Sequence, residues 1–564
     1  MPLQWVEYAA LLAVVVAAAF PVGRYLACVS ARQPTWLDRM LCPIESWIYA
    51  ITGVDDRQEM PAGVYTRCFI AFGALGTLGL FALLVAQRWL PGGPDDRYLT
   101  TPMTIDLAAN TAISFATTTT WQAYAGESTL RYVIQAVGLV SQNFLAGAAG
   151  LAVGFAFMRG FARERSESIG NFWVDLVRAL LWVLLPASVI GGFVLVWQGV
   201  PANIAPYTQT RTLEGAAQVI AQGPVAPLEF IKNLGTNGGG FFNANGAHPF
   251  ENPTPFTNLL ALLAIAVVPA SLPIAFGELC GRRRAGWVLL AAMVVLFVGG
   301  LVVCDRAEQA APPRFADLRL SGGNMEGKDV RFGISQSVLT AVVTSNGATG
   351  SYNSMHDSYR PMGVLVPLVN MLIGEVVFGG LGSGLYGMVM IALVAVFLGG
   401  LMIGRTPEYL GKRITPDENR FVVLYALLTP AVVLVLTALA IATPAGRAGL
   451  VTNTGTRGFT EILFAYASST GNNGQTMAGL DANSLFYNST TAIAMLAGRF
   501  GLVAIALAVA GRFAAQGRSP TTAGTLPSDS ATFGILVIGT VVLIGALCFL
   551  PALALGPVAE AFQH

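Results

Sequence analysis

Charged residues are scarce in this sequence: they make up 11% of its 564 residues and nearly cancel, at a formal net charge of +1. Nothing in this balance points to a nucleic-acid partner. Only three histidines are present, and they are scattered, which argues against a histidine-based zinc site. The six cysteines show no paired spacing, and most lie in or beside apolar runs. We therefore expect them to be small buried side chains rather than disulfide partners or metal ligands.

Enzyme motifs are also missing. The chain contains no His-Glu-x-x-His, no Gly-x-Ser-x-Gly and no Cys/His dyad, which disfavours an enzyme. Gly322 to Lys328 fits the start of a phosphate-binding loop, but Asp329 stands where Ser or Thr is required. Gly382, Gly384 and Gly387 spell a dinucleotide-binding fingerprint inside an apolar run rather than at a strand-to-helix turn. Both matches are coincidences of a glycine-rich chain.

Long apolar runs, by contrast, are abundant. Hydrophobic residues make up 54% of the chain, and many runs reach the roughly 20 residues that are needed to cross hydrocarbon. The sequence predicts an all-α integral membrane protein with ten transmembrane helices, at 4–28, 64–90, 128–158, 174–199, 256–278, 285–304, 363–403, 420–443, 483–513 and 530–556. The run 363–403 is too long for one straight span, and glycines break its centre.

The distribution of arginines predicts the orientation in the bilayer. The first span has no basic residue ahead of it and is followed by Arg24 and Arg32, so it reads as a membrane anchor with the N-terminus outside. Threading the chain from there places four basic connections on the cytoplasmic side, at 159–165, 282–284, 405–413 and 512–518. With an even number of spans, the C-terminus is also expected outside.

The stretch Gly235 to Asn245, Gly-Thr-Asn-Gly-Gly-Gly-Phe-Phe-Asn-Ala-Asn, is the feature around which the chain is organised. It follows a short segment, 227–234, that is long enough for two turns of helix but too short to cross a bilayer. Glycines let backbone carbonyls point the same way, and Thr and Asn add further oxygens, so such a stretch can replace the water around K⁺. The preceding half-helix would direct the negative end of its dipole at the ion.

A short helix followed by an oxygen-rich stretch occurs four times, each time between two spans. The short helices are expected at 107–116, 227–234, 335–344 and 459–470. Four units of helix, re-entrant pore loop and helix around one axis resemble a single-chain version of a tetrameric potassium channel. The predicted organisation is a first anchor and cytoplasmic connection (1–63), pore repeats (64–173, 174–284, 285–417 with a broken second helix, and 418–528) and a last transmembrane helix (529–564).

Several strings resemble one known family, the potassium-binding A subunits of the bacterial Kdp potassium-transporting P-type ATPases. They are Thr-Thr-Trp-Gln-Ala-Tyr-Ala-Gly-Glu (119–127), the 235–245 stretch with His-Pro-Phe-Glu-Asn-Pro (248–253), Asn-Ser-Met-His-Asp-Ser (353–358), Gly-Glu-Val-Val-Phe-Gly-Gly (374–380) and Pro-Glu-Tyr-Leu-Gly-Lys (407–412). The likeness covers essentially the whole chain. It implies a multi-pass protein of the bacterial inner membrane that binds external K⁺ and delivers it through an intramembrane tunnel to an ATP-hydrolysing partner.

The resemblance also implies site residues and partners. The K⁺ filter would be formed by Thr117, Thr118, Thr119, Thr120, Gln122, Gly235, Ser345, Asn346, Gly347, Asn472, Asn473 and Gly474. The family usually alternates Thr and Asn where this chain has Thr118 and Thr120, and usually has Cys in place of Asn346. The expected partners are the B, C and small F subunits of the Kdp complex and the lipid bilayer. ATP and Mg²⁺ are expected on the partner, with no cofactor in this chain, which has no stretch polar enough for a nucleotide-binding domain.

Two charged residues within predicted spans are candidates for a gate below the filter, and the family resemblance implies that their positions lie at the entrance of the tunnel. Glu375 and Arg499 are costly in hydrocarbon, so each is expected to face the pore or a partner charge. Gly380, Gly382 and Gly384 would supply a flexible gating loop. A purely structural ion pair between Glu375 and Arg499 is an equal alternative.

For the protein as a whole, the alternative function is that of a stand-alone potassium channel or cation symporter of the same architecture.

Overall fold

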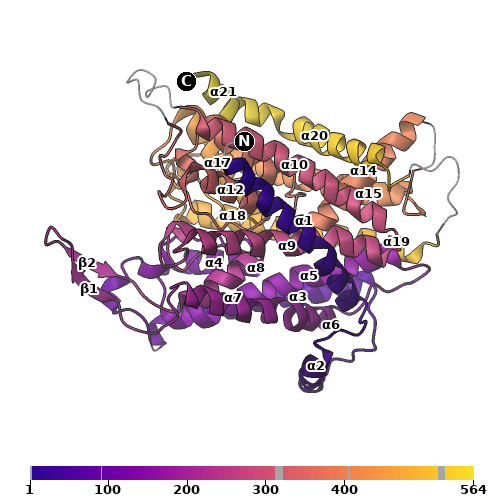
Figure 1. Ribbon diagram of the computed structural model, residues 1–564, viewed down its shortest axis with the longest axis horizontal. Helices are drawn as coiled ribbons and strands as arrows, with labels where there is room; N and C mark the ends of the chain where they lie inside the picture. Colours follow the sequence, from indigo (N-terminus) through magenta and orange to yellow (C-terminus); the bar gives the residue numbers. More distant parts are fainter. Residues whose placement is uncertain (1–2, 91, 312–321, 404–406, 519–526, 564) are drawn as a thin grey trace.

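The computed structural model describes residues 3–90, 92–311, 322–403, 407–518 and 527–563. Long helices dominate it (Figure 1), and the described part of the chain contains ten that are long and apolar enough to cross a membrane. This confirms the ten predicted spans. They are α1 (Leu3–Ser30), α3 (Ala62–Ala86), η4–α5 (Ile134–Leu139, Val140–Ala162), α6–η5–α7 (Phe172–Arg178, Ala179–Leu184, Leu185–Trp197), α9 (Pro255–Leu279), α10 (Arg283–Gln309), α14 (Ser383–Ile403), α15 (Pro416–Ala442), α18–η8–α19 (Leu485–Leu496, Ala497–Gly501, Leu502–Ala515) and α20–η9–α21 (Ala531–Leu553, Ala554–Val558, Ala559–Gln563).

The four predicted half-helices are all present. They are α4 (Ile105–Ala116), α8 (Val225–Leu234), α12 (Gly333–Asn346) and α17 (Gly455–Gly471). The seventh span is broken as expected: α13 (Pro361–Leu372) and α14 are separated by the non-helical residues 373–382, in which Gly374, Gly380 and Gly382 have positive φ. A straight helix cannot pass through such a backbone.

The third span begins later than predicted. Its first helical turn starts at Ile134 rather than at residue 128. The side chain of Gln87 explains the shift, because its amide donates to the Thr129 carbonyl (3.2 Å) and accepts from the Arg131 backbone nitrogen (3.4 Å). Those backbone groups are thereby held in a non-helical connection. The apolar character of this segment reflects burial against the bundle, not a longer span.

Several short elements were not predicted. They are α2 (Asp38–Thr52) and α16 (Pro444–Arg447), the hairpins β1–β2 (Thr208–Arg211, Ala217–Ile220) and β3–β4 (Glu408–Tyr409, Lys412–Arg413), and the single turns η1 (Gln87–Trp89), η2 (Asp96–Tyr98), η3 (Gly126–Ser128), η6 (Asn245–Ala247) and η7 (His356–Ser358). The fold is thus mainly, not purely, helical. In Figure 1 the β1–β2 hairpin projects from one end of the bundle.

The basic connections gather at one end of the molecule and the chain termini at the other. Arg165 donates to the Gln516 carbonyl (3.2 Å), Lys412 to that of Gly160 (3.2 Å), and Arg518 to that of Cys280 (3.3 Å). Near the termini, Tyr8 contacts the start of α12, and Thr456 contacts the side chain of Gln563. Arg405, part of one predicted basic connection, lies outside the described residues.

Helix α5 positions the functional region. It is buried along almost its entire length, and its glycines allow a close approach of neighbouring backbones. A methyl group added to Gly150 would lie 2.9 Å from the Leu381 carbonyl, and one added to Gly154 would lie 3.2 Å from the Cα of Gly382. Gly147 packs against Gly235 in the same way, at 3.3 Å. One face of α5 therefore supports both the second pore loop and the break in the seventh span.

Candidate functional site: a four-walled filter

The four half-helices end in loops that share one backbone pattern. In each loop two residues, two positions apart, have positive φ with a residue of negative φ between them: Thr118 and Thr120, Thr236 and Gly238, Ala348 and Gly350, Asn472 and Gly474. A left-handed conformation costs about 1–2 kcal/mol for a residue with a Cβ, so it persists only where the surroundings enforce it. Its recurrence in four loops defines four equivalent walls.

The walls close into a ring. The hydroxyl of Thr120 donates to the Asn237 carbonyl at 2.5 Å, which joins the first wall to the second. At the other three joints the backbones of neighbouring walls pack directly against each other. A Cβ added to a glycine of one wall would lie too close to a carbonyl oxygen of the next wall: 1.6 Å from that of Thr349 for Gly238, 2.2 Å from that of Asn473 for Gly350, and 2.1 Å from that of Thr119 for Gly474. Each wall therefore contacts the next, and the fourth contacts the first. The four walls enclose a central axis, as a pore requires.

A cavity lies at each end of this ring. The first left-handed residue of every wall lines the inner cavity, namely Thr118, Thr236, Ala348 and Asn472. The cavity on the other side of the ring, which we name the outer vestibule, is lined by Thr120, Gly239, Gly350 and Gly474. The ring thus separates two cavities, of which the outer one is much the larger. The carbonyl ends of all four half-helices point to the same place, and their dipoles favour a cation there.

The outer vestibule contains a buried histidine. His356 is 1% exposed, and burial, aided by nearby Lys328, lowers its pKa to about 4. It is therefore uncharged at neutral pH. A cation entering the vestibule is therefore not repelled by the imidazole of His356.

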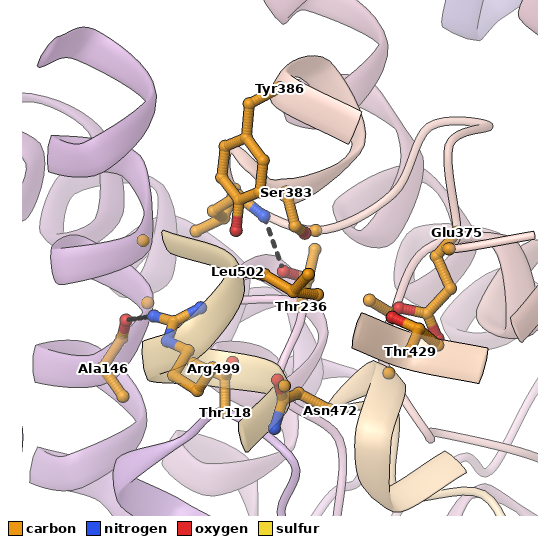
Figure 2. Close-up of a pocket in the computed structure, with 18 of the residues that line it drawn as sticks. Thr118, Ala146, Thr236, Glu375, Ser383, Tyr386, Thr429, Asn472, Arg499 and Leu502 are labelled. Carbon is orange, nitrogen blue, oxygen red and sulfur yellow. Dashed lines mark hydrogen bonds between the residues drawn. The ribbon is translucent and has the colours of Figure 1, made fainter. Parts of the chain in front are cut away.

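Figure 2 shows the inner cavity, with Arg499 and Glu375 on opposite sides of it. They do not form the ion pair that was one of the two expectations. Arg499, on η8, donates to the carbonyl of Ala146 in α5 at 2.9 Å, and Glu375 accepts from the amide of Asn473 at 2.8 Å. Each is fixed by a partner on its own side, and both side chains line the cavity below the filter.

The break in the seventh span lies directly beneath two walls. The backbone nitrogen of Gly380 donates to the Gly347 carbonyl (3.2 Å), and that of Leu381 donates to the Thr236 hydroxyl (3.1 Å). Gly380 lines the cavity. Gly382 and Gly384, also predicted for the gate, instead allow the loop to pack against α5 and against its own backbone.

The predicted filter residues fall into two groups. Thr117–Thr120, Gly235, Gly347 and Asn472–Gly474 belong to the walls, and Gln122 joins the first two walls by accepting from the Gly240 nitrogen at 2.8 Å. Ser345 and Asn346 lie in the last turn of α12 rather than in the loop, because their side chains donate back to the Val342 carbonyl within that helix.

The predicted filter residues do not include Thr236, Asn237, Gly238, Ala348, Thr349, Gly350 and Gly471, although the first three belong to the 235–245 stretch that the sequence singles out. A signal for them exists in the sequence. Three walls read Gly-x-x-Gly, at 235–238, 347–350 and 471–474, and the first reads Thr-Thr-Thr-Thr at 117–120. In this pattern the counterpart of Gly235 in the fourth wall is Gly471.

A buried charge cluster supports the second wall from behind. Lys232 is fully buried between Glu229 and Glu251, and it also donates to Asn245 at 2.8 Å. Asn245 in turn donates to the Gly239 carbonyl at 2.5 Å. The cluster therefore holds the loop after the filter in place.

We expect Lys232→Met to destabilise the protein by about 3–5 kcal/mol, because the buried carboxyl groups of Glu229 and Glu251 would lose the cation between them. Thermal inactivation of the detergent-purified protein should occur at a clearly lower temperature. Arg97→Met is the matched control, since the side chains of Arg97 and Asp95 are 62% and 63% exposed and their pairing contributes little. Equal midpoints for the two variants would contradict a stabilising role for the Lys232 cluster.

The chain was compared with known proteins. The family model described as potassium-transporting ATPase A subunit matches residues 9–562. A protein of Methylorubrum extorquens is 50% identical over 558 residues, 99% of this chain and 97% of that protein. One of Solibacter usitatus is 48% identical over 550 residues, with 98% and 96% covered. Both are named potassium-transporting ATPase potassium-binding subunit.

Among solved structures, the potassium transporter TrkH from Vibrio parahaemolyticus is similar, with a TM-score of 0.53 over 86% of this chain and 97% of that one. The identity is 14%, so this likeness concerns the fold alone. It agrees with the predicted channel-like repeat architecture.

Proposed function

This chain belongs to the potassium-transporting ATPase A subunit family, and from that premise we propose that it is the potassium-binding subunit of such a pump and takes up K⁺ at its four-walled filter. The observation that carries the proposal is the closed ring of four walls with a cavity at either end. A ring of carbonyls can replace the hydration shell of K⁺ only if it surrounds the ion, and four half-helix dipoles favour the cation further.

Transport begins when K⁺ leaves the outer vestibule and sheds water between the walls. It then reaches the inner cavity, where the carboxyl of Glu375 offers oxygen atoms and Arg499 carries a positive charge. The guanidinium opposes a straight exit of the cation, and the loop at Gly380 and Leu381 closes the cavity from another side. K⁺ is therefore diverted sideways, through an intramembrane tunnel, to the subunit that hydrolyses ATP.

ATP and Mg²⁺ are bound by a partner chain in this proposal. The sequence contains no phosphorylatable aspartate motif and no polar stretch long enough for a nucleotide-binding domain. The relatives are named as subunits of an ATPase, which supports a complex. We assign the ATP-hydrolysing role to a P-type B subunit, with C and small F subunits completing a Kdp-type assembly.

The bacterial inner membrane is the proposed location, with both termini on the outer side. The grouping of Arg165, Lys412 and Arg518 at one end of the bundle supports this orientation, because basic residues are retained on the cytoplasmic side. The half-helices and the vestibule then open outward, toward the K⁺ to be captured.

Gentle purification of this chain from its native membranes tests the proposal. We expect a P-type ATPase chain to co-elute, and we expect ATP hydrolysis by the eluate to be stimulated by low K⁺ but not by Na⁺. The physical reason is that only an occupied filter would supply the partner with its ion. An intact, monodisperse preparation without a partner or K⁺-stimulated hydrolysis would instead favour a stand-alone channel or symporter.

A further inference from the structure

Helix α2, which follows the first span, carries three distinct faces. One face packs on the bundle: Leu41 is 4% exposed, Asp38 accepts from the indole nitrogen of Trp182 at 2.9 Å, and Glu45 lies 3.9 Å from Arg178. These contacts come from α6 and η5. They fix the rotation of α2 about its own axis, so the direction of its other faces is set.

The second face is an exposed apolar stripe. It begins just before the helix, and its members are 43–81% exposed: Trp36, Met40, Ile44, Trp47 and Ile51. Intervals of three and four residues keep these side chains on one side of a helix. The stripe lies roughly a third of a turn from the face that packs on the bundle, at about 100° per residue.

The third face is narrow and carries the polar side chains of Arg39 and Ser46 beside the small side chain of Cys42, all exposed. The apolar stripe thus has the bundle on one side and a face suited to water on the other. A helix in solution would leave such a stripe unfavourably hydrated. An amphipathic helix at a membrane surface has this arrangement, with Trp at the headgroup level and Arg beside the apolar face.

The position of α2 indicates what covers the stripe. The span α1 ends at Ser30, and α2 starts at Asp38, so it lies close to the plane in which that span leaves the hydrocarbon. In Figure 1, α2 is seen nearly end-on beside the bundle, whereas α1 and α10 run across the picture. Its axis therefore crosses the direction of the spans, as an axis parallel to the membrane plane does.

We propose that α2 is an interfacial helix, whose stripe Trp36–Met40–Ile44–Trp47–Ile51 inserts into the acyl–headgroup boundary of the leaflet in which α1 ends. Lipid is the occupant that this surface fits, because the exposed apolar stripe follows directly after the membrane span α1 and is flanked by Arg39, which can pair with phosphate. The inference rests on the membrane-spanning architecture and not on the K⁺ filter.

Spin labelling tests it on the full chain in the complex in which it purifies. Contrary to the expectation from sequence, only Cys280 and Cys304 are buried, whereas Cys42 is exposed and Cys28, Cys68 and Cys548 are half-buried. These four are replaced by serine, and a nitroxide is attached at Trp47→Cys or, as the matched control, at Ser46→Cys. Both are exposed sites on the same turn. The protein is reconstituted in phosphatidylethanolamine/phosphatidylglycerol vesicles, and collisions with O₂ and with a water-soluble nickel chelate are measured.

The label at position 47 is expected to collide preferentially with O₂, with an O₂-to-nickel ratio several times that at position 46. Ile44→Cys should behave like position 47, since it belongs to the same stripe. Preferential nickel access at position 47 would show a water-facing stripe and overturn the proposal. An immobilised label shielded from both reagents would overturn it too, because a protein partner would then cover the stripe.

Discussion

Gly238→Ala is expected to raise the K⁺ concentration for half-maximal stimulation of ATP hydrolysis at least tenfold and to weaken the rejection of Na⁺. The added methyl group would lie 1.6 Å from the Thr349 carbonyl, in a backbone with φ +87°. The left-handed conformation alone costs an alanine about 1–2 kcal/mol, and about 1.4 kcal/mol is tenfold in an equilibrium constant. Relief of the clash must move the second wall away from the third, which opens the ring.

Gly299→Ala is the matched control for this prediction. Gly299 lies in α10, and a methyl group there meets nothing within 4 Å, so K⁺ activation and Na⁺ rejection should stay as in the parent protein. Activation curves for K⁺, Rb⁺ and Na⁺ on the purified complex give the comparison. If Gly238→Ala folded normally and kept both properties, the joint between the second and third walls would not be part of the filter.

The spans and half-helices could be predicted because, in a bilayer, the local sequence largely determines which segments are helical and where they end. An apolar run of span length has few alternatives in hydrocarbon, and a short helix followed by Gly, Thr and Asn has to end where those residues begin. Thus α8 ends at Leu234, one residue before Gly235, as expected. The break in the seventh span followed from its glycines in the same way.

The register of the filter could not be predicted as well, because it depends on where each half-helix stops. Ser345 and Asn346 look like loop residues, yet bonds from their side chains to Val342 keep them in α12. The relation of Glu375 to Arg499 was undetermined for another reason. The side of the cavity on which Glu375 or Arg499 lies depends on how separate repeats pack together. The sequence around either residue does not reveal that packing.

Helix α2 escaped prediction because it is amphipathic and short. Its 15 residues include three charged side chains, so it falls below the length and hydrophobicity of a span. Hydropathy detects helices that cross the membrane, whereas a helix lying in its surface differs from a soluble helix only in the face that it exposes. That face became visible only when the contacts of Asp38 and Glu45 fixed the orientation of the helix.

Arg499→Gln is expected to make the protein leak K⁺ without ATP. The guanidinium is buried beside the inner cavity, directly below the filter, and it is the positive charge that opposes a straight exit of the cation. Two unit charges about 5 Å apart at an effective dielectric constant of about 20 repel by about 3 kcal/mol. Removing that repulsion should raise passive K⁺ flux by roughly a hundredfold, at about 1.4 kcal/mol for each factor of ten.

The choice of glutamine separates charge from structure, because its amide can still donate to the Ala146 carbonyl that Arg499 contacts at 2.9 Å. Arg499→Lys, which keeps the positive charge, is the matched control and should not increase the passive K⁺ flux. Efflux of K⁺ from vesicles that contain the purified complex, measured without ATP, distinguishes the two variants. If both were equally tight, the barrier below the filter would be the loop at Gly380 and Leu381 alone, and Arg499 would hold α5 against η8 without gating the ion.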